Sequence, residues 1–589
     1  MPTLSWLGKE KVVNHHLDVP FFVLDKKYSF DTQRNATQRN ATQRNATLYQ
    51  ENQSNTINNR IIHGDNLTVL KSLLPEFEGK VNCIYIDPPY NTGNEGWVYN
   101  DNVNDPRITK WLGDVVGKEG EDLSRHDKWL CMMYPRLKLL HRLLAEDGVI
   151  FISIDENEIS HLRLIMDEIF GEQNFVEQII WNKRVPKNDK YIGNIHEYIV
   201  LYTRSQNFEY KFIQKKEGID EVYEFLNGLK NKKVDVSEAE KLIKAFYKKN
   251  NYDRGITLYN SLDENYNLWG KINVSWPNGQ TEGPRYDVFH PITKKPCKVP
   301  DRGWRWKKST FDELLDYDNV KELPDGSFIC GSIWFAKDEN TQPSSIKYLD
   351  EVSDFLLRSI ISTKSEGSVY LKDIISENFD YPKPVSLIET LLFSFSNKNA
   401  LILDSFAGSG TTAHAVLKLN AQDGGNRRFI LCEMMDYAES ITAERVRRVM
   451  EGYGEGNKKI EGVGGSFDFY ELGDALFSES GLLNESVGIE RIRQYIAYSE
   501  SIPLDNQLPL ENSISPSALG INQQTLWLFH YNKDAITSLD LGFLGTLNLQ
   551  NISRPSQFVV YADKCVLDDK FMQKHGITFK RIPRDIMRF

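Results

Sequence analysis

The four consecutive residues Asp87-Pro88-Pro89-Tyr90 could activate an amino group attached to an aromatic ring. The lone pair of such an amine is delocalised into the ring, so the amine is a poor nucleophile until hydrogen bonds localise the pair on nitrogen. The carboxylate of Asp87 can accept one N–H hydrogen bond and the carbonyl of Pro88 another, while Pro89 keeps the backbone rigid. Tyr90 offers a flat ring on which a nucleic-acid base can stack. The alternative interpretation is a rigid turn at the end of a strand.

A second candidate site is the glycine-rich segment Asp404-Ser405-Phe406-Ala407-Gly408-Ser409-Gly410-Thr411. Its glycines allow the backbone to approach a ligand closely, and residues 408–413 fit the weak dinucleotide pattern G-x-G-x-x-A. No lysine stands where a nucleoside-triphosphate loop requires one. Glu433 ends the next predicted strand, where a carboxylate can bind ribose hydroxyls, although it can also be a solvated strand end. The predicted nucleoside-binding residues are therefore Asp404, Phe406, Ala407, Gly408, Gly410, Thr411 and Glu433.

Alternating strands and helices position both motifs. Leucines and isoleucines at helical spacing predict helices over residues 130–144 and 159–169, and short β-branched runs predict strands at residues 81–87, 148–155, 198–202, 400–404 and 428–433. Both motifs directly follow a strand, which is where open α/β sheets place their ligand crevice. The fold class is therefore predicted to be α/β, with a doubly wound, Rossmann-like core. We expect Asp87 and the glycine turn to face one shared cleft.

Together the two motifs resemble those of the amino-group DNA methyltransferases, in which a D-P-P-Y tetrapeptide activates adenine and an F-x-G-x-G loop binds S-adenosylmethionine. Phe406-Ala407-Gly408-Ser409-Gly410 matches that loop. The motif order, with a large insertion between the two, resembles the beta class. Gly64-Asp65-Asn66-Leu67 and Arg125-His126-Asp127-Lys128-Trp129-Leu130 further resemble the modification subunit of type III restriction systems. The resemblance covers most of the chain and is weakest in the insertion and in the C-terminal region.

The resemblance implies an enzyme that flips an adenine out of double-stranded DNA and methylates its 6-amino group, with S-adenosylmethionine as the cofactor. The catalytic residues would be Asp87, Pro88, Pro89 and Tyr90. Asp65 would contact the adenine of the cofactor and Lys383 would lie near its methionine carboxylate, but Asp65 is equally suited to cap the helix that follows it. Modification subunits of this kind form homodimers and pair with a separate ATP-dependent restriction subunit.

Three other functions remain open at this level. Cytosine carries a similar amine, so a cytosine-N4 DNA methyltransferase is a competitor, although the cytosine enzymes of the resembled family usually begin the tetrapeptide with serine. An NAD-dependent oxidoreductase could use residues 408–413, but it would leave Asp87-Pro88-Pro89-Tyr90 without a role. A non-catalytic DNA-binding regulator would bind DNA without incorporating methyl groups.

The insertion contains a basic stretch that predicts contact with DNA. Residues 271–308 hold nine Lys or Arg against three acidic residues, and among them lie Trp276, Tyr286, Phe289, Trp304 and Trp306. Basic side chains bind phosphates, and aromatic rings stack on bases or insert into grooves. By the resemblance this segment is the target-recognition domain, and its DNA-binding candidates are Arg285, Lys294, Lys295, Lys298, Arg302, Arg305, Lys307 and Lys308. A solvated surface is the alternative explanation.

Five segments are predicted along the chain: an N-terminal extension (1–60), a catalytic half (61–204), the inserted target-recognition domain (205–380), a cofactor-binding half (381–475) and a C-terminal α+β interaction region (476–589). The extension contains T-Q-R-N-A three times, from Thr32 to Ala46, which predicts a solvated linker. The repeated DNA unit AACGC can encode this peptide, although other codons spell it too, and gain or loss of one such unit would shift the reading frame. We therefore hypothesise that expression is phase-variable through replication slippage.

Composition narrows the class of protein further. The 589 residues are 40% hydrophobic and 26% charged, which favours several globular domains over a disordered chain. No apolar run reaches the roughly 18 residues of a membrane span and no signal-peptide pattern is present, so a cytoplasmic location is expected. The six cysteines form no C-x-x-C pair and the histidines show no metal-ligand spacing, so neither a disulfide framework nor a metal site is predicted. With a net charge of −11, the chain needs a locally basic surface to bind DNA.

Overall fold

The computed structural model describes residues 3–32, 58–92, 124–183, 192–363, 367–456 and 459–584, except the single positions 217, 278, 353, 479 and 551, together with Lys110 and Gly113. Apart from Thr32, the predicted repeat linker lies outside the described residues. The chain forms two compact units, Met1–Tyr210 with Arg358–Phe589, and Lys211–Leu357. The second unit is shorter than the expected insertion of residues 205–380, because both ends of that segment belong to the first unit.

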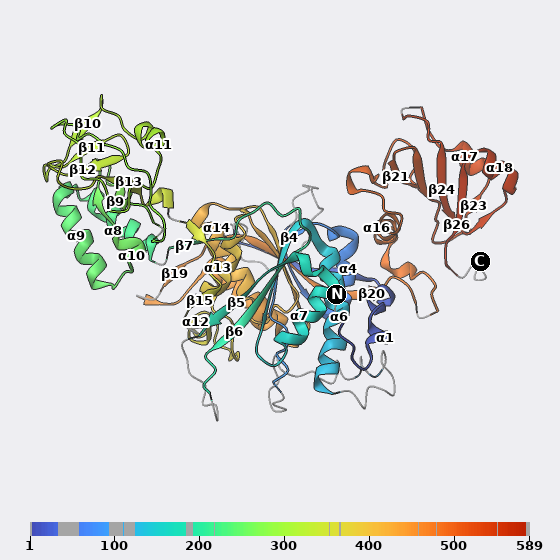
Figure 1. The fold of residues 1–589 in the computed structure, drawn as a ribbon. Helices are drawn as coiled ribbons and strands as arrows, with labels where there is room; N and C mark the ends of the chain where they lie inside the picture. Colours follow the sequence, from blue (N-terminus) through green and yellow to red (C-terminus); the bar gives the residue numbers. More distant parts are fainter. Residues whose placement is uncertain are drawn as a thin grey trace. The chain divides into compact units, whose positions relative to one another are not determined.

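A ten-stranded mixed sheet is the framework of the first unit (Figure 1). Its strands are, in spatial order, β1 (Phe22–Asp31), β20 (Ser466–Ala475), β2 (Asn59–His63), β17 (Arg428–Glu433), β16 (Leu401–Asp404), β3 (Val81–Ile86), β4 (Leu144–Ile154), β6 (His196–Thr203), β5 (Phe175–Asn182) and β15 (Ile360–Ser362). The six strands from β20 to β4 run parallel, whereas β1 and β6 are antiparallel to their neighbours. This parallel centre confirms the predicted Rossmann-like α/β core.

The direction of the connections reverses between β3 and β16. Helices α4 (Asn66–Phe77) and α6 (Arg125–Leu143) lead from β2 to β3 and from β3 to β4, whereas α14 (Thr411–Asp423) leads from β16 back toward β17. Because such crossovers are right-handed, α14 lies on the face opposite to α4 and α6. A reversal of this kind opens a crevice at the carboxyl ends of the two central strands. Both sequence motifs begin at this crevice, since Asp87 follows β3 and Asp404 ends β16.

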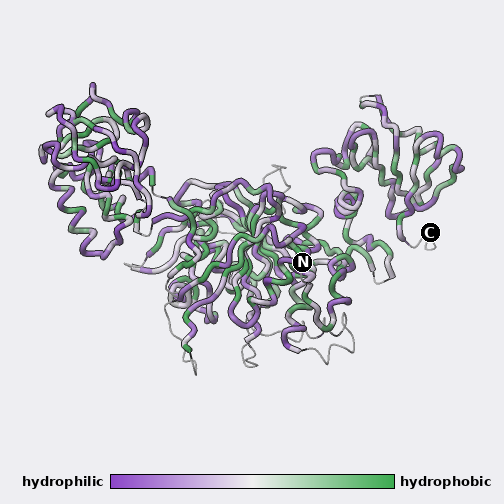
Figure 2. Tube along the Cα trace, viewed as in Figure 1, coloured by the Kyte–Doolittle hydropathy of each residue, from purple (hydrophilic) through white to green (hydrophobic). Residues whose placement is uncertain are grey.

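The central strands are buried, which explains why they are continuous apolar runs rather than alternating ones. Figure 2 shows hydrophobic residues concentrated in the middle of the first unit. Helices α4, α6 and α7 (Ile159–Phe170) share one hydrophobic cluster with the inner strands. The start of α6 is defined by a capping box, in which the Ser124 hydroxyl accepts a hydrogen bond from the Asp127 amide and the Asp127 carboxylate accepts one from the Ser124 amide. The remaining elements of this part are α1 (Lys9–Val12), α2 (His15–Asp18), α12 (Gly367–Ile374), α13 (Val385–Ser394), α15 (Glu444–Glu451), β18 (Gly452–Tyr453) and β19 (Ile460–Glu461).

The second unit is built on an antiparallel sheet with a helical part. The chain passes into it through β7 (Ile213–Lys215) and leaves through β14 (Asp354–Leu356), which pair with each other. Between them lie the helices α8 (Ile219–Asn231), α9 (Val236–Lys249), α10 (Arg254–Thr257) and α11 (Lys308–Glu313). The sheet has the order β10 (Val320–Glu322), β11 (Phe328–Cys330), β12 (Ile333–Phe335), β13 (Ser344–Tyr348), β9 (Leu268–Asn273) and β8 (Tyr259–Leu262).

The two chain ends differ from the expected pattern. Residues of the predicted N-terminal extension form β1, which is an edge strand of the main sheet. The C-terminal region contains α16 (Ile489–Ser499) and a sheet of β21 (Ala518–Asn522), β22 (Thr525–Phe529), β24 (Gln557–Ala562) and β26 (Ile577–Arg581). In place of an α+β pattern, β22, β24 and β26 run parallel, with β23 (Ser538–Leu539), α17 (Leu541–Gly545), β25 (Lys564–Cys565) and α18 (Asp569–Lys574) in the connections. None of the described helices has the length and apolar character needed to cross a membrane.

Candidate active site

Asp87 lies at the carboxyl end of β3, and its carboxylate is buried. Its Oδ2 atom accepts a hydrogen bond from Lys383 Nζ at 2.9 Å. Its Oδ1 atom is also buried but has no hydrogen-bond partner among the described residues. A buried oxygen without a donor is unfavourable, because it has lost its hydration without compensation. Asp87 therefore has one buried oxygen whose capacity to accept a hydrogen bond is not used by any described residue.

Lys383 and Glu197 complete a charged cluster around Asp87. Lys383 Nζ donates to the Tyr90 hydroxyl at 2.8 Å and lies 3.6 Å from Glu197 Oε2. The Tyr90 hydroxyl donates to the same Glu197 oxygen at 3.1 Å, and Lys183 forms an ion pair with the other oxygen of Glu197. The expected proximity of Lys383 to a cofactor carboxylate stays a prediction, whereas its contact with Asp87 was not anticipated from the sequence.

The pKa values in this cluster shift in different directions. Burial raises the pKa of Asp87, against the opposing effect of the Lys383 ammonium. Burial also disfavours the charged form of Glu197, but the Lys383 and Lys183 cations outweigh it and lower the Glu197 pKa. Burial alone would lower the pKa of Lys383, yet the two carboxylates raise it. Lys383 is therefore a buried cation at neutral pH, and Asp87 binds a proton more readily than an exposed aspartate.

Trp129 fixes the backbone between Asp87 and Tyr90. Its indole Nε1 donates to the Pro89 carbonyl at 2.7 Å, and its ring is completely buried. Tyr90 is nearly buried, and its ring centroid lies 4.8 Å from the Lys383 ammonium. Trp129 thus takes one acceptor position of the Pro89 carbonyl, while the use of the Pro88 carbonyl by a ligand amine stays a prediction.

The glycine-rich turn starts on the strand next to β3. The pairing of Leu403 with Ile84 aligns β16 and β3, so both motifs stand at the same edge of the sheet. Gly408 and Gly410 have φ angles of 52° and 79°, which side-chain-bearing residues rarely adopt. A Cβ atom on Gly410 would also approach the carbonyl oxygen of Thr442 to 3.1 Å. The turn is thus packed closely against the backbone at Thr442.

Two buried carboxylates stabilise this turn by accepting hydrogen bonds. Asp404 accepts hydrogen bonds from the Phe406 amide at 3.0 Å and from the Thr412 hydroxyl at 2.5 Å. Glu433, at the end of β17, accepts one from the Gly408 amide at 2.8 Å. Burial raises the pKa of Asp404 to about 7 and that of Glu433 to about 7. Glu433 therefore positions the turn, while its predicted contact with ribose stays a prediction.

Asp65 is the N-cap of α4, as the alternative interpretation of its sequence position proposed. Its Oδ2 atom accepts hydrogen bonds from the Thr68 amide at 2.9 Å and the Thr68 hydroxyl at 2.8 Å. Its Oδ1 atom lies 3.2 Å from Arg136 Nη2. The carboxylate remains partly exposed at the edge of the sheet, and its contact with a cofactor adenine stays a prediction.

One small pocket contains both motifs, as the position of the motifs in the sequence led us to expect. It is lined by Tyr85, Asp87, Asp404, residues 406–409, Thr411 and Thr412, together with the chain segment at Phe379 and residues 381–383. Its volume is about 20 Å³, enough for a single water molecule but far below the roughly 300 Å³ of the smallest ligand sites. A nucleoside-sized ligand therefore requires a wall of the pocket to move.

The eight basic candidates of the second unit are all exposed. Three of them already form ion pairs with neighbouring carboxylates, namely Arg285 with Glu282, Lys295 with Glu339 and Lys308 with Asp312. The aromatic prediction needs one correction. Trp304 is completely buried in the core of the second unit and donates its Nε1 hydrogen to the Tyr286 carbonyl at 2.8 Å. It cannot stack on a base, whereas Phe289 is exposed.

A family model described as DNA methylase matches residues 81–445, which is more than half of the chain and includes both motifs. The chain belongs to the DNA methylase family. The chain is 33% identical to the EcoP15I Mod subunit, a type III restriction-modification enzyme of Escherichia coli, over 427 residues that make up 69% of this chain and 62% of the relative. It is also 33% identical to the EcoPI Mod subunit of Escherichia phage P1 over 408 residues, which are 65% of this chain and 58% of the relative.

The chain spans between half and two thirds of the length of these curated relatives, with 52% for the StyLTI Mod subunit of Salmonella typhimurium. Among solved structures, it is similar to the M1.HpyAVI–SAM complex, with 13% identity and a TM-score of 0.28 over 66% of this chain and 99% of the other. It is also similar to TTHA0409, a putative DNA modification methylase of Thermus thermophilus, with 16% identity and a TM-score of 0.30 over 71% of this chain and 100% of the other.

The sequence did not predict Glu197 and Lys183 as residues of this site. It also did not predict that Trp129 donates a hydrogen bond to the Pro89 carbonyl. The one available signal was the carboxylate of Glu197 directly before the apolar run of β6, where the side chain is buried. A buried charge usually has a partner. That partner, Lys383, is 186 positions further along the chain.

Proposed function

We propose that this methylase transfers a methyl group from S-adenosylmethionine to the N6 amine of an adenine in double-stranded DNA. The observation that carries the proposal is the buried Oδ1 atom of Asp87, which has no described partner, on a residue that lines the same pocket as the glycine turn. Membership of the DNA methylase family supports methyl transfer. Aspartate rather than serine at the first position of the tetrapeptide favours adenine over cytosine, by the resemblance described for that motif.

The residues around the pocket fit S-adenosylmethionine. The glycine turn exposes backbone to a ligand at the crevice. Glu433 ends β17 and Asp65 follows the neighbouring strand β2 by two residues, where a nucleoside would lie. The Lys383 ammonium can pair with a carboxylate of the ligand. When bound, S-adenosylmethionine supplies an electrophilic methyl group on its positively charged sulfonium.

The tetrapeptide orients the amine for attack. Asp87 Oδ1 accepts one N–H hydrogen bond and the Pro88 carbonyl accepts the other, so the nitrogen lone pair points out of the plane of the base. The ring of Tyr90 supports the flipped base. Holding the amine close to the methyl donor contributes roughly 7 to 11 kcal/mol to lowering the barrier. After transfer the nitrogen carries an extra proton, which Asp87 can hold because burial raises its pKa.

The macromolecular partners follow from the same proposal. DNA would bind to the exposed basic residues of the second unit, which we assign as the target-recognition domain. Because the relatives from E. coli and phage P1 are Mod subunits, we propose a homodimer that pairs with an ATP-dependent restriction subunit in the cytoplasm. The region from residue 476 onward is the proposed interaction domain. Phase variation stays a hypothesis, and a gene that encodes the repeat without the AACGC unit would exclude it.

The decisive experiment compares the full chain with its Asp87→Ala variant in a methyl-incorporation assay on DNA. We expect the variant to lose at least about a hundredfold in transfer, because the lone pair is no longer localised, while DNA affinity changes little. Asp534→Ala, which removes an exposed carboxylate of the C-terminal region, serves as the control. Equal methylation by Asp87→Ala would refute the catalytic assignment. Single-molecule sequencing of the product identifies the methylated base, and a binding assay with NAD excludes or supports the oxidoreductase.

A further inference from the structure

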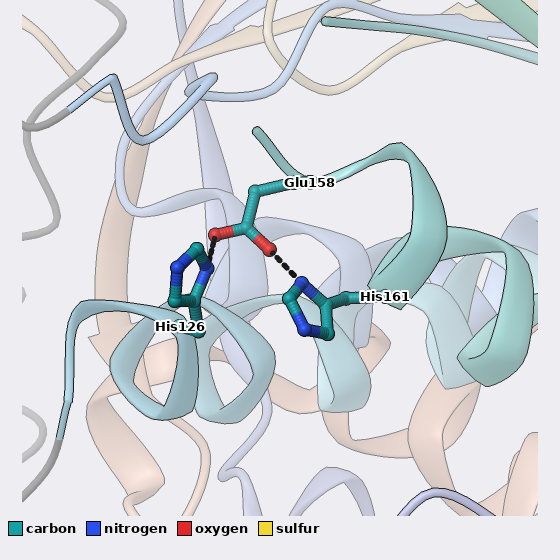
Figure 3. A group of neighbouring side chains, drawn as sticks. All are labelled: His126, Glu158 and His161. Atoms are coloured by element: carbon teal, nitrogen blue, oxygen red, sulfur yellow. Dashed lines mark hydrogen bonds and ion pairs between the residues drawn. The ribbon is translucent and has the colours of Figure 1, made fainter. Parts of the chain in front are cut away.

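Two histidines and one carboxylate form a cluster at the starts of α6 and α7 (Figure 3). Glu158 Oε1 lies 2.6 Å from His126 Nδ1, and Glu158 Oε2 lies 2.8 Å from His161 Nδ1. Each residue offers one ligand atom, and these three atoms lie within 4.8 Å of one another. Figure 3 shows both imidazole rings turned toward the carboxylate. The sequence predicted no metal site, because His126 and Glu158 are far apart along the chain.

The electrostatics of this cluster call for a positive charge. The Glu158 carboxylate is completely buried, and its ion-pair contacts with described residues are both to histidine. Its other contact is the side-chain amide of Asn91, which donates a hydrogen bond but carries no charge. An ionised carboxylate is stable in such a place only beside a cation. A metal ion held between the three side chains would supply this charge.

We propose that His126, Glu158 and His161 bind a zinc ion. Two imidazole nitrogens and one carboxylate are an established ligand set for zinc, and the fourth position then belongs to water. Glu158 and His161 are separated by three positions at the first turn of α7, so they share one helix face. The histidine side chains are about one third exposed, at 34% and 30%, which gives an ion access from solvent.

The observed spacing is close to that of a filled site. Ligand atoms around a tetrahedral zinc ion lie roughly 3.4 Å apart, given metal–ligand bonds of about 2.1 Å. Each histidine nitrogen therefore needs to withdraw from its hydrogen-bonded carboxylate oxygen by less than about 1 Å. Ligand atoms that lie as much as 4.8 Å apart need to approach each other by up to about 1.4 Å. Both hydrogen bonds are then replaced by bonds to the ion, and any imidazolium proton is released to solvent.

The ion would act as a clamp and not as a participant in methyl transfer. It joins α6 through His126 and α7 through Glu158 and His161. Asn91 extends the connection to the tetrapeptide, since its side-chain amide donates to Glu158 and to the Arg125 carbonyl, the latter at 3.1 Å. Arg125 in turn donates to the Asn91 carbonyl at 3.0 Å. The metal site thus supports the backbone immediately after Tyr90.

The test uses the full-length chain, freed of metal with a chelator and titrated with zinc chloride by calorimetry. We expect one tight zinc site per chain in the wild type and in His575→Gln, which replaces an exposed histidine of the C-terminal region. His161→Gln is expected to lose that site. Cobalt substitution should give a visible absorption spectrum typical of nitrogen and oxygen ligands in the wild type and in His575→Gln, but not in His161→Gln. Zinc should raise the Tm of the wild type and leave the Tm of His161→Gln unchanged.

Two results would overturn the proposal. If the metal-free wild type binds no zinc, the cluster is a hydrogen-bonded group that takes no metal. If His161→Gln binds zinc as tightly as the wild type, the ion lies elsewhere. Circular dichroism of the metal-free proteins shows that a loss of binding in His161→Gln does not reflect unfolding.

Discussion

Lys383 already makes at Asp87 the kind of contact that the proposed substrate amine requires. Its ammonium donates to Asp87 Oδ2 at 2.9 Å and lies 4.8 Å from the centre of the Tyr90 ring. Asp87 therefore has one oxygen engaged by a cation and one oxygen available. Since an ammonium next to a carboxylate favours the ionised form, Lys383 keeps Asp87 able to accept hydrogen bonds despite burial.

Replacing Lys383 with methionine should move the acid limb of the pH profile of methyl transfer to higher pH. Without the ammonium, burial raises the pKa of Asp87 further and the Glu197 pKa also rises, so more of Asp87 is protonated at a given pH. The measurement is kcat/KM against pH. Lys183→Met is the matched control, because Lys183 contacts Glu197, and its substitution should shift the limb less. An unchanged profile in Lys383→Met would contradict this role.

Glu433 should make stability depend on pH. Its pKa rises from 4.5 to about 7 on burial, so the folded state keeps the proton while the unfolded state loses it. Stability from this group is fully present below about pH 4.5 and is lost as pH rises toward 7, by up to about 3 kcal/mol. We expect the free energy of unfolding of Glu433→Gln to fall less over this range than that of the wild type. Urea titrations at several pH values measure it, and parallel curves would argue against the shifted pKa.

At the scale of elements, α14 begins and ends at glycines with left-handed backbones. Gly410, at its N-terminus, has a φ of 79°, and Gly424, at its C-terminus, has a φ of 67°. Only the first is crowded, since nothing lies within 4 Å of a Cβ atom built on Gly424. Thr442, which crowds Gly410, also donates its hydroxyl hydrogen to the Gly408 carbonyl at 2.6 Å. The conformation at the start of α14 therefore affects the shape of the glycine-rich turn, whereas the conformation at the end of α14 does not.

This difference predicts separate effects of two similar substitutions. Gly410→Ala and Gly424→Ala should each lower the free energy of unfolding by about 1 to 2 kcal/mol, because alanine is strained at these φ angles. Only Gly410→Ala should also weaken S-adenosylmethionine binding, since Thr442 must shift and the turn with it. Thermal unfolding and calorimetric titration measure the two quantities. Equal cofactor affinity in both variants would place the cofactor away from this turn.

At the scale of the whole molecule, the two units carry different parts of the proposed reaction. The pocket is built entirely from the first unit. The exposed basic residues predicted to bind DNA belong to the second unit, which the chain enters and leaves through the paired strands β7 and β14. Such an insertion can be changed without disturbing the core it interrupts. A local basic surface is needed because the net charge of −11 repels DNA on average.

The double variant Arg305→Ala, Lys307→Ala should weaken DNA binding and leave S-adenosylmethionine binding unchanged. Each phosphate contact that is lost should reduce the slope of log affinity against log salt by about 1. Lys248→Ala, Lys249→Ala is the matched control, because it removes the same charge from exposed positions on α9 of the same unit. Fluorescence anisotropy at several salt concentrations gives the slopes. Identical slopes in the two double variants would assign DNA binding to another surface.

The pattern of hydrophobic residues was sufficient to predict the strands and helices that carry the site. The strand predicted at residues 428–433 is β17, and the helix predicted over residues 159–169 differs from α7 by one residue. Hydrophobic periodicity is a property of neighbouring residues, so it is readable without a fold. The placement of both motifs directly after buried strands also predicted their shared cleft, since parallel strands end at one edge of a sheet.

Tertiary structure alone decided which side chains meet. Glu197 reaches Lys383 because β6 joins the sheet beyond β4, and His126 reaches Glu158 because α6 and α7 pack side by side. The sequence also could not show that Trp304 is a core residue and not a DNA contact. Burial of a ring depends on which other parts of the fold cover it. Amino-acid sequence by itself determined the elements and the two motifs at their ends. Strand order and packing determined the contacts, because these join residues whose separation along the chain carries no information about their distance in space.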